Sequence, residues 1–164
     1  MADTRDTIVA EYAGLVWRIA GSYEANPDLR RDLNQEILFS VWKALPSFRG
    51  DASVKTFIAR IAHNICVSHV AKIMRSPREM ELQDQFTSDA ATPEEAADAN
   101  RQKEMLAAAI RTLPLEWRQP LSLTLESFTP KEIADVLGVS PNIVSIRLTR
   151  AKAALKQKLE HHHA

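Results

Sequence analysis

The chain has 164 residues, of which 45% are hydrophobic and 26% charged, and its 21 basic and 21 acidic residues leave no net charge. This composition is ordinary for a globular protein and excludes a disordered or fibrous one, while the length suffices for one medium or two small domains. Few glycines occur, which argues against a loop-rich all-β protein. No apolar run approaches the roughly 18 to 20 residues that cross a bilayer. The single cysteine, Cys66, cannot form an internal disulfide. We therefore expect a cytoplasmic protein with no membrane insertion.

The zero net charge conceals two basic segments. Residues 37–75 contain six basic side chains against one acid, Asp51, and residues 141–158 contain five against none. The residues between them, 76–104, are predominantly acidic. Two basic segments on either side of an acidic one indicate two separate surfaces for a polyanion such as DNA.

Residues 1–75 predict three helices that bury one core. The first helix carries five apolar or aromatic residues on one face, which are Ile8, Tyr12, Leu15, Val16 and Ile19. The second begins at Asn26 and Pro27, as N-cap and first helical residue, and stops at Pro46. The third is capped by Ser53, and its expected buried face consists of Val54, Phe57, Ile58, Ile61 and Ile65.

Residues 76–91 lose this periodicity and are polar and acidic, so we expect a flexible linker there. Thr92 and Pro93 then predict the start of another helix, which Pro114 ends, and a further helix follows from Leu115 to about Ser127. The last residues, 161–164, resemble the remnant of a purification tag and are left out of functional reasoning.

The most informative segment follows at residues 129–158. Thr129, Pro130 and Glu132 form a second capping box that opens a short helix, and Gly138 supplies a turn. Ser140 and Pro141 then open a strongly basic helix. A short helix, a glycine turn and a basic helix are typical of the helix-turn-helix of DNA-binding proteins.

Together the two parts resemble a bacterial RNA polymerase sigma factor of the extracytoplasmic-function (ECF) type, in the sigma-70 family. In the first part the resemblance lies in residues 32–36, followed by Phe39, Trp42, Leu45 and Phe48, and in residues 48–51 and 57–64. In the second part it lies in residues 113–118, 132–134, 137–140 and 144–152. It implies an all-α fold of two small helical domains joined by a flexible acidic linker, with a helix-turn-helix in the second. Residues 1–75 would then be the domain that docks on core polymerase and recognises and melts the −10 element, and residues 92–160 the domain that recognises the −35 element.

The resemblance also implies a function, which is to bind core RNA polymerase, recognise specific promoter DNA and promote transcription initiation. It requires no cofactor, and it implies a separate anti-sigma protein as regulator. Two alternatives stay open: a stand-alone helix-turn-helix regulator, and a sigma-like decoy that sequesters an anti-sigma protein. The segment from Asp32 to Arg75 favours the sigma factor, because a simple regulator needs no polymerase-docking module.

Three sets of candidate site residues follow. Those expected to contact the −35 element are Asn142, Ile143, Ser145, Ile146, Arg147, Thr149 and Arg150. Those expected to hold the single strand of the −10 element are Asn64, Ser68, Lys72 and Arg75. Those expected to contact core polymerase are Asp32, Gln35, Glu36 and Trp42, although Trp42 fits a position in the core equally well.

Catalytic and metal sites are not expected. His63, Cys66 and His69 recur every three residues, which spreads their side chains over about 120° of a helix and suits no single metal ion. We expect instead a buried Cys66 between two histidines on the polar face. No glycine-rich phosphate loop, paired metal carboxylates or nucleophile with its base is visible, so we expect neither an enzyme nor a small-molecule substrate.

Overall fold

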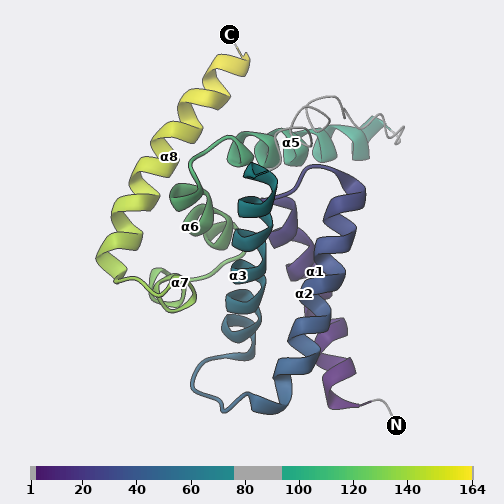
Figure 1. Cartoon of the computed structure of the whole chain (residues 1–164). Coiled ribbons are helices and arrows are strands. Elements are labelled where there is room, and N and C mark those ends of the chain that lie inside the picture. The colour runs from purple at the N-terminus through teal and green to yellow at the C-terminus, as the bar shows by residue number, and fades with distance from the viewer. Residues whose placement is uncertain (1–2, 76–93, 164) are drawn as a thin grey trace.

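The computed structural model describes residues 3–75 and 94–163, and every regular element within these residues is a helix (Figure 1). The first domain contains α1 (Thr4–Gly21), α2 (Pro27–Ala44), the short 3-10 helix η1 (Leu45–Ser47) and α3 (Val54–Met74). The second domain contains α5 (Glu94–Arg111), α6 (Leu115–Leu125), α7 (Pro130–Leu137) and α8 (Pro141–His163). The prediction of an all-α fold in two helical domains is confirmed. The linker predicted at 76–91 and the cap at Thr92 lie outside the described residues.

Side-chain caps set the helix starts in the first domain. The side-chain oxygen of Asn26 accepts from the backbone N–H groups of Asp28 at 2.9 Å and Leu29 at 3.2 Å, and Pro27 is the first helical residue. The hydroxyl oxygen of Ser53 accepts from the backbone N–H of Thr56 at 3.1 Å. Both predicted caps are therefore confirmed, because each side chain satisfies N–H groups that have no partner within the helix.

The core of the first domain lies where α1, α2 and α3 meet. Its fully buried side chains include Val16, Ile19, Leu33, Ile37, Val41 and Ile58. On α3 the buried face differs from the predicted one, because Ala59, Ala62 and Cys66 are fully buried while Phe57, Ile61 and Ile65 are only partly buried. The physical reason is the position of α3 in the middle of the molecule, between α1 and α2 on one side and α7 on the other (Figure 1). A helix packed on two sides buries a wider face than one amphipathic stripe predicts.

The helix-turn-helix forms as the sequence predicts. The Glu132 backbone N–H donates to the Thr129 hydroxyl at 3.2 Å, and the Thr129 N–H donates to the Glu132 carboxylate at 2.9 Å, which completes the capping box of α7. Gly138 ends α7 in the left-handed conformation, with φ of +69°. The α8 helix then buries Val144, Leu148 and Ala151 and packs on α6 and α7.

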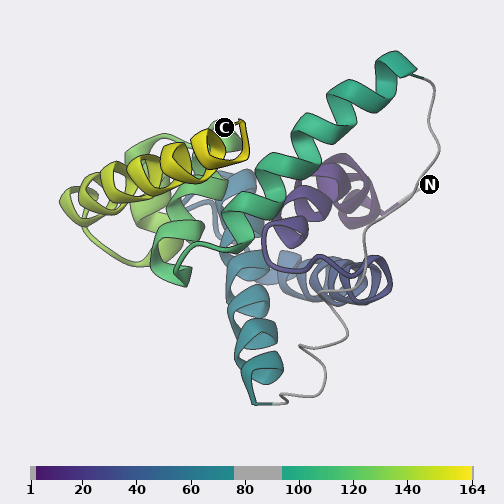
Figure 2. The same cartoon turned by 90° about the horizontal axis from the view of Figure 1, so that it is seen from above.

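The two domains pack against each other. The helix α7 lies against α3, and one apolar cluster joins Ile58 of α3 to Ile133 and Val136 of α7. Seen from above, α5 extends across the end of the first domain, and α8 lies on the outer side of the second (Figure 2). Among the described residues, no helix has both the length and the apolar character needed to cross a membrane.

Two glycines provide a matched test of the backbone. Gly138→Ala should destabilise the protein by about 1 to 2 kcal/mol, because a left-handed conformation strains any residue with a Cβ, although that Cβ would meet no atom within 4 Å. Gly14→Ala, on the exposed face of α1, should instead stabilise it by up to about 1 kcal/mol through helix propensity. Urea denaturation of both variants is the measurement. Equal effects of the two substitutions would contradict the assigned conformation of Gly138.

Candidate nucleic-acid interface

The outer face of α8 carries the seven residues predicted to contact duplex DNA. Burial of Val144, Leu148 and Ala151 fixes the rotation of the helix about its own axis. Six of the predicted residues are consequently exposed, and Arg147 is half-buried at the edge. Ile143 and Ile146 are 39% and 43% exposed, which is unusual for large apolar side chains. This face of α8 therefore points away from the core of the second domain.

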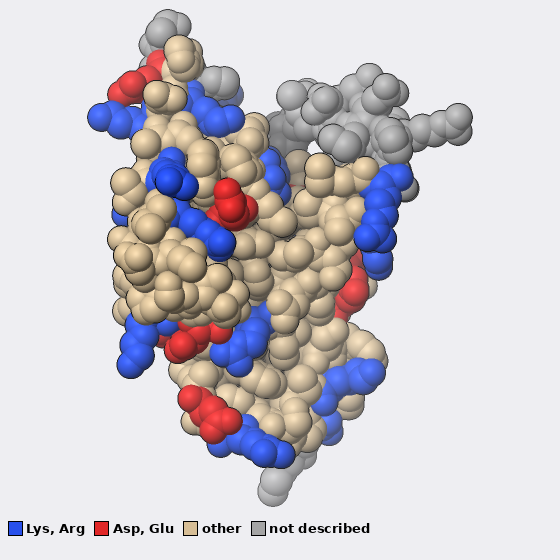
Figure 3. All heavy atoms as spheres, turned by 60° about the vertical axis from the view of Figure 1, so that its left-hand side comes forward, with Lys and Arg blue, Asp and Glu red and all other residues tan. Residues whose placement is uncertain are grey.

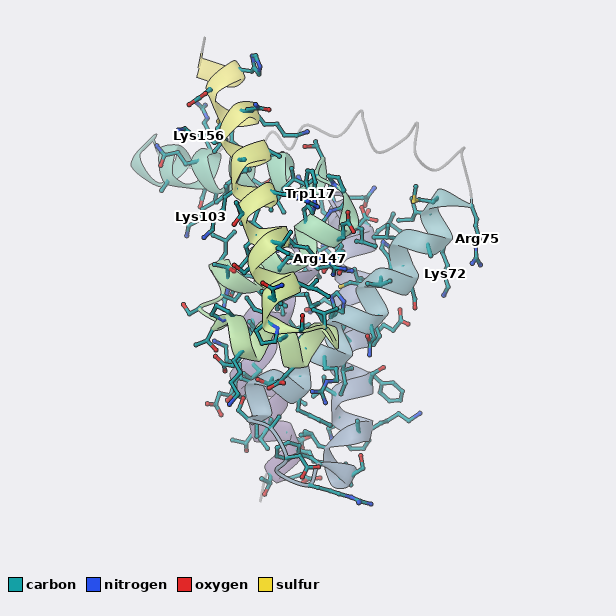
Figure 4. The ribbon with its side chains drawn as sticks, turned by 90° about the vertical axis from the view of Figure 1, so that its left-hand side faces the viewer. Lys72, Arg75, Lys103, Trp117, Arg147 and Lys156 are labelled. Carbon is teal, nitrogen blue, oxygen red and sulfur yellow. The ribbon has the colours of Figure 1, made fainter. Side chains whose placement is uncertain are left out.

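The basic side chains of this side of the molecule lie in separate patches. Figure 3 shows blue side chains on the second domain and others on the opposite edge and the lower end, with wide uncharged areas between them. In Figure 4, Arg147 lies in the first turns of α8 and Lys156 several turns beyond it. The basic side chains of α8 are therefore spread along the length of the helix.

A second polar face lies on α3. Asn64, Ser68, Lys72 and Arg75 are all exposed, and their spacing places them on the side of α3 opposite the buried Ala59 and His63. Lys72 and Arg75 extend from the C-terminal end of α3, away from α8 (Figure 4). The structure therefore brings these four residues together but keeps them separate from the α8 face.

The third predicted set, on α2, is divided by the structure. Asp32, Gln35 and Glu36 are exposed, whereas Trp42 is held against α1. The Trp42 Nε1–H donates to the Asp6 carboxylate at 3.1 Å, and the Arg5 guanidinium lies 4.1 Å from the Trp42 ring centroid. Trp42 therefore stabilises the packing of α2 on α1.

Phe39 completes the exposed face of α2; it belongs to the segment that carries the family resemblance but was not among the predicted polymerase contacts. It is 59% exposed and lies three residues after Glu36 and seven after Asp32, which places the three side chains on one helix face. Helical spacing from the two acids was the signal that could have identified it. The face thus has an exposed aromatic ring on the C-terminal side of the two acids, and the Lys43 ammonium lies 5.4 Å from the centroid of that ring.

The histidines of α3 do not lie on a polar face, so that expectation is wrong. His63 is only 8% exposed, and its Nδ1 lies 3.2 Å from the buried Tyr23 hydroxyl. His69 Nε2 lies 2.8 Å from a carboxylate oxygen of Glu24, which is itself buried. The two histidines bond to different partners, and the described residues contain no group of three side chains that could hold a metal ion.

Cys66, in contrast, is buried as expected. Burial raises the pKa of its thiol to about 12, since the apolar surroundings disfavour the thiolate. The thiol is therefore unreactive near neutral pH.

Two family models match most of the chain. Sigma-70 region 2 matches residues 8–76, and sigma-70 region 4 matches residues 103–155. The chain is 25% identical to the RNA polymerase sigma-H factor of Pseudomonas aeruginosa, over 94% of this chain and 86% of that protein. It is 26% identical to the ECF RNA polymerase sigma-E factor of Escherichia coli K12, over 93% of this chain and 85% of that protein.

Solved structures share the fold. CnrH in complex with the cytosolic domain of CnrY has a TM-score of 0.69 and 22% identity, over 96% of this chain and 88% of that one. The sigma factor RpoE of Bartonella quintana, in complex with the anti-sigma factor NepR, has a TM-score of 0.72 and 20% identity, over 94% of this chain and 96% of that one. The arrangement of two helical domains is thus common to all three.

The buried His63 gives a testable pH dependence. Burial lowers its pKa to about 4 from an ordinary value near 6.5. Between these values the unfolded chain binds a proton that the folded chain does not, so stability falls as pH falls from about 6.5 toward 4. We expect a loss of about 2 kcal/mol between pH 7 and pH 5, measured by urea denaturation.

The control is His63→Gln, whose side chain does not titrate and whose amide group can either donate to or accept from the Tyr23 hydroxyl. Its stability should change by about 2 kcal/mol less over the same pH interval. An identical pH dependence of the two proteins would show that His63 does not carry the effect.

Proposed function

The chain belongs to the sigma-70 family of bacterial RNA polymerase sigma factors, in its extracytoplasmic-function group, and from that membership we propose how its exposed surfaces share the work of transcription initiation. As a sigma factor it binds core RNA polymerase and brings it to promoter DNA. The observation that carries the proposal is the separation of three exposed faces on α2, α3 and α8, each fixed in direction by a buried face of its own helix.

The exposed face of α8, which we call the upstream surface, recognises the −35 element as duplex DNA. We define this surface as Asn142, Ile143, Ser145, Ile146, Arg147, Thr149 and Arg150. An α-helix fits the major groove, and residues at its N-terminal end reach base edges there. Asn142 and Ser145 offer hydrogen-bonding groups, and Arg147 and Arg150 reach guanine edges or phosphates. Ile143 and Ile146, already exposed, suit the methyl groups of thymine.

The exposed face of α3, which we call the downstream surface and define as Asn64, Ser68, Lys72 and Arg75, holds the non-template strand of the −10 element. Side chains of this kind at helical spacing present alternating hydrogen-bonding and positive groups along a backbone. Bases released from the stack can then be bound individually.

The exposed face of α2, which we call the polymerase surface and define as Asp32, Gln35, Glu36 and Phe39, docks on core polymerase. An exposed aromatic side chain beside polar and charged groups is typical of protein interfaces. The acids favour a basic partner surface, and Phe39 supplies apolar area that is exposed in the free chain.

We also propose that an anti-sigma protein regulates this chain. The chain itself acts in the cytoplasm and has no enzymatic activity of its own. One relative of the same fold is a sigma factor crystallised with an anti-sigma factor. The exposed Ile143 and Ile146 offer such an inhibitor an apolar contact, which would compete with promoter DNA. The polymerase surface favours this account over both a stand-alone regulator and a decoy, since neither needs to engage polymerase.

The direct test is run-off transcription with sigma-free core polymerase and a pool of genomic promoters. The chain should initiate from a selected subset. Asp32→Arg with Glu36→Arg should abolish initiation at every promoter, because reversed charge repels a basic docking surface. Arg150→Ala should change which promoters are used, with a cost of about 1 to 3 kcal/mol at one base position if it contacts a base.

Matched controls separate these effects from general damage. Glu11→Arg with Glu116→Arg makes the same change of charge at exposed positions outside the three surfaces and should initiate normally. Lys156→Ala, beyond the recognition end of α8, should lower transcription slightly and equally at all promoters. Absence of selective initiation by the unaltered chain would refute the sigma-factor account, and an unchanged promoter preference in Arg150→Ala would leave that residue only a phosphate contact.

A further inference from the structure

Most side chains of the upstream surface form two rows along α8. Residues four and seven positions apart in a helix lie one above another on the same face, because each turn holds about 3.6 residues. The first row has this spacing and consists of Asn142, Ile146 and Thr149. The second row has it too, lies about 100° further around the helix, and consists of Ile143, Arg147 and Arg150.

The first row occupies the centre of the outward face. The side chains that α8 buries in the second domain are Val144, Leu148 and Ala151. At about 100° for each residue, Ile146 lies roughly 140° or more around the helix from all three of them. Arg147 of the second row, in contrast, is half-buried at the edge of the face. A helix in the major groove presents the centre of its outward face to the base edges, so the first row meets the bases directly.

Thr149 has a methyl group, rather than a hydroxyl hydrogen, free for a partner. Its hydroxyl donates to the backbone carbonyl of Ser145, one turn earlier in α8, at 2.9 Å. Threonine can make this bond within a helix, and the bond uses the only hydrogen that the hydroxyl can donate. The Asn142 amide, in contrast, bonds to no other described residue, so its donors and its acceptor are available to a base.

The first row therefore presents an amide followed by two methyl-bearing side chains. An asparagine amide pairs with N6 and N7 of adenine through two hydrogen bonds, and the C5 methyl of thymine is an apolar group that no other base displays in the major groove. Ile146 is 43% exposed in the free chain, so a methyl placed against it removes apolar surface from water. Neither Ile146 nor Thr149 has a free donor for the two acceptors of guanine.

The spacing along the row suits neighbouring base pairs. A rise of about 1.5 Å per residue places Ile146 about 6 Å beyond Asn142, and Thr149 about 4.5 Å beyond Ile146. Base pairs of the duplex follow one another at about 3.4 Å. Ile146 and Thr149 therefore lie about one base-pair step apart, and Asn142 lies about two steps before them.

We propose that Ile146 and Thr149 form a methyl-recognition pair, which selects thymine at two neighbouring positions of the −35 element, while Asn142 selects adenine about two base pairs away. The inference rests on the proposed function, since it names the class of DNA sequence that the upstream surface recognises. Discrimination at the two thymines comes from apolar contact, and the arginines of the second row contribute phosphate or guanine contacts at the side of the groove.

The first measurement uses holoenzyme, assembled from core polymerase and the full chain, and a promoter library randomised in the upstream element. The selected promoters should share two neighbouring thymines on one strand and an adenine about two base pairs from them. Deoxyuridine in place of either thymine removes only the C5 methyl, and it should weaken holoenzyme binding about three- to fivefold at each position. Deoxyuridine in place of thymines outside both promoter elements is the control and should leave the affinity unchanged.

Matched variants distinguish the methyl group from the hydroxyl. Thr149→Val keeps a methyl and removes the hydroxyl, so it should retain the effect of deoxyuridine at both positions. Thr149→Ser keeps the hydroxyl and removes the methyl, so it should lose the effect at one position, and Ile146→Ala should lose it at the neighbouring position. Ile143→Ala removes an equally apolar exposed side chain from the second row and should retain the effect at both positions, whatever its overall affinity. Circular dichroism of each variant verifies that its helices are intact.

The outcomes separate this inference from the proposed function. Selected promoters that lack neighbouring thymines, or equal binding of thymine and deoxyuridine promoters, would overturn the methyl-recognition pair and leave the sigma-factor role intact. Loss of the deoxyuridine effect in Thr149→Val would also overturn it, because the hydroxyl would then be the group that contacts the base. Failure of the holoenzyme to select any promoter would overturn the proposed function together with this inference.

Discussion

The carbonyl groups at the C-terminal end of an α-helix are acceptors that the helix itself cannot satisfy, and the arrangement of this protein depends on how they are met. Gly138 ends α7 with a left-handed turn, which satisfies part of the need locally. Elsewhere arginine and lysine side chains from the opposite domain donate to the ends of α1, α6 and α7. Such contacts are directional and accompany an apolar cluster that extends through both domains, so they orient domains that apolar burial holds together.

The position of α3 follows from this arrangement. One side of the helix, with Ile58, belongs to the core of the first domain, and another, with Lys55 and Arg60, contacts the second domain. The remaining side carries the downstream surface. Small residues such as Ala59 and Ala62 occur where two partners approach the helix closely. The same helix therefore contributes to folding, to domain contact and to the proposed DNA-binding surface, and a change at one of its faces is expected to affect the others.

Features that depend on local chemistry could be predicted from the sequence. The caps at Asn26 and Ser53, the capping box at Thr129 and the turn at Gly138 each involve neighbours within a few residues, and all are present. The outward face of α8 was also predictable, since its buried stripe fixes its rotation. The resemblance to ECF sigma factors added the order and the roles of the two domains.

Features that depend on distant partners could not be predicted in this way. His63 has a polar side chain, yet it is buried, because it forms a hydrogen bond with the buried Tyr23 hydroxyl, forty residues earlier. Trp42 contacts Arg5 and Asp6 of α1, whereas Phe39 of the same helix is 59% exposed. Arg18 donates to Glu126 and Arg60 to Asp135, and helical periodicity cannot reveal contacts between segments so far apart in the sequence. The predicted linker, residues 76–91, lies outside the described residues and stays a prediction.

The central claim is that the chain acts as a sigma factor whose two domains bind promoter elements about 25 base pairs apart, or roughly 85 Å of duplex, which the packed chain cannot span. It is tested most directly by a distance between spin labels on the two domains, one at Glu11→Cys on α1 and one at Gln157→Cys on α8, both exposed positions. The buried Cys66, whose pKa burial raises to about 12, should remain unlabelled. Pulsed electron paramagnetic resonance should give a single distance below roughly 40 Å in the free chain and a clearly longer one when core polymerase and promoter DNA are added. The same distance in both states would contradict the account.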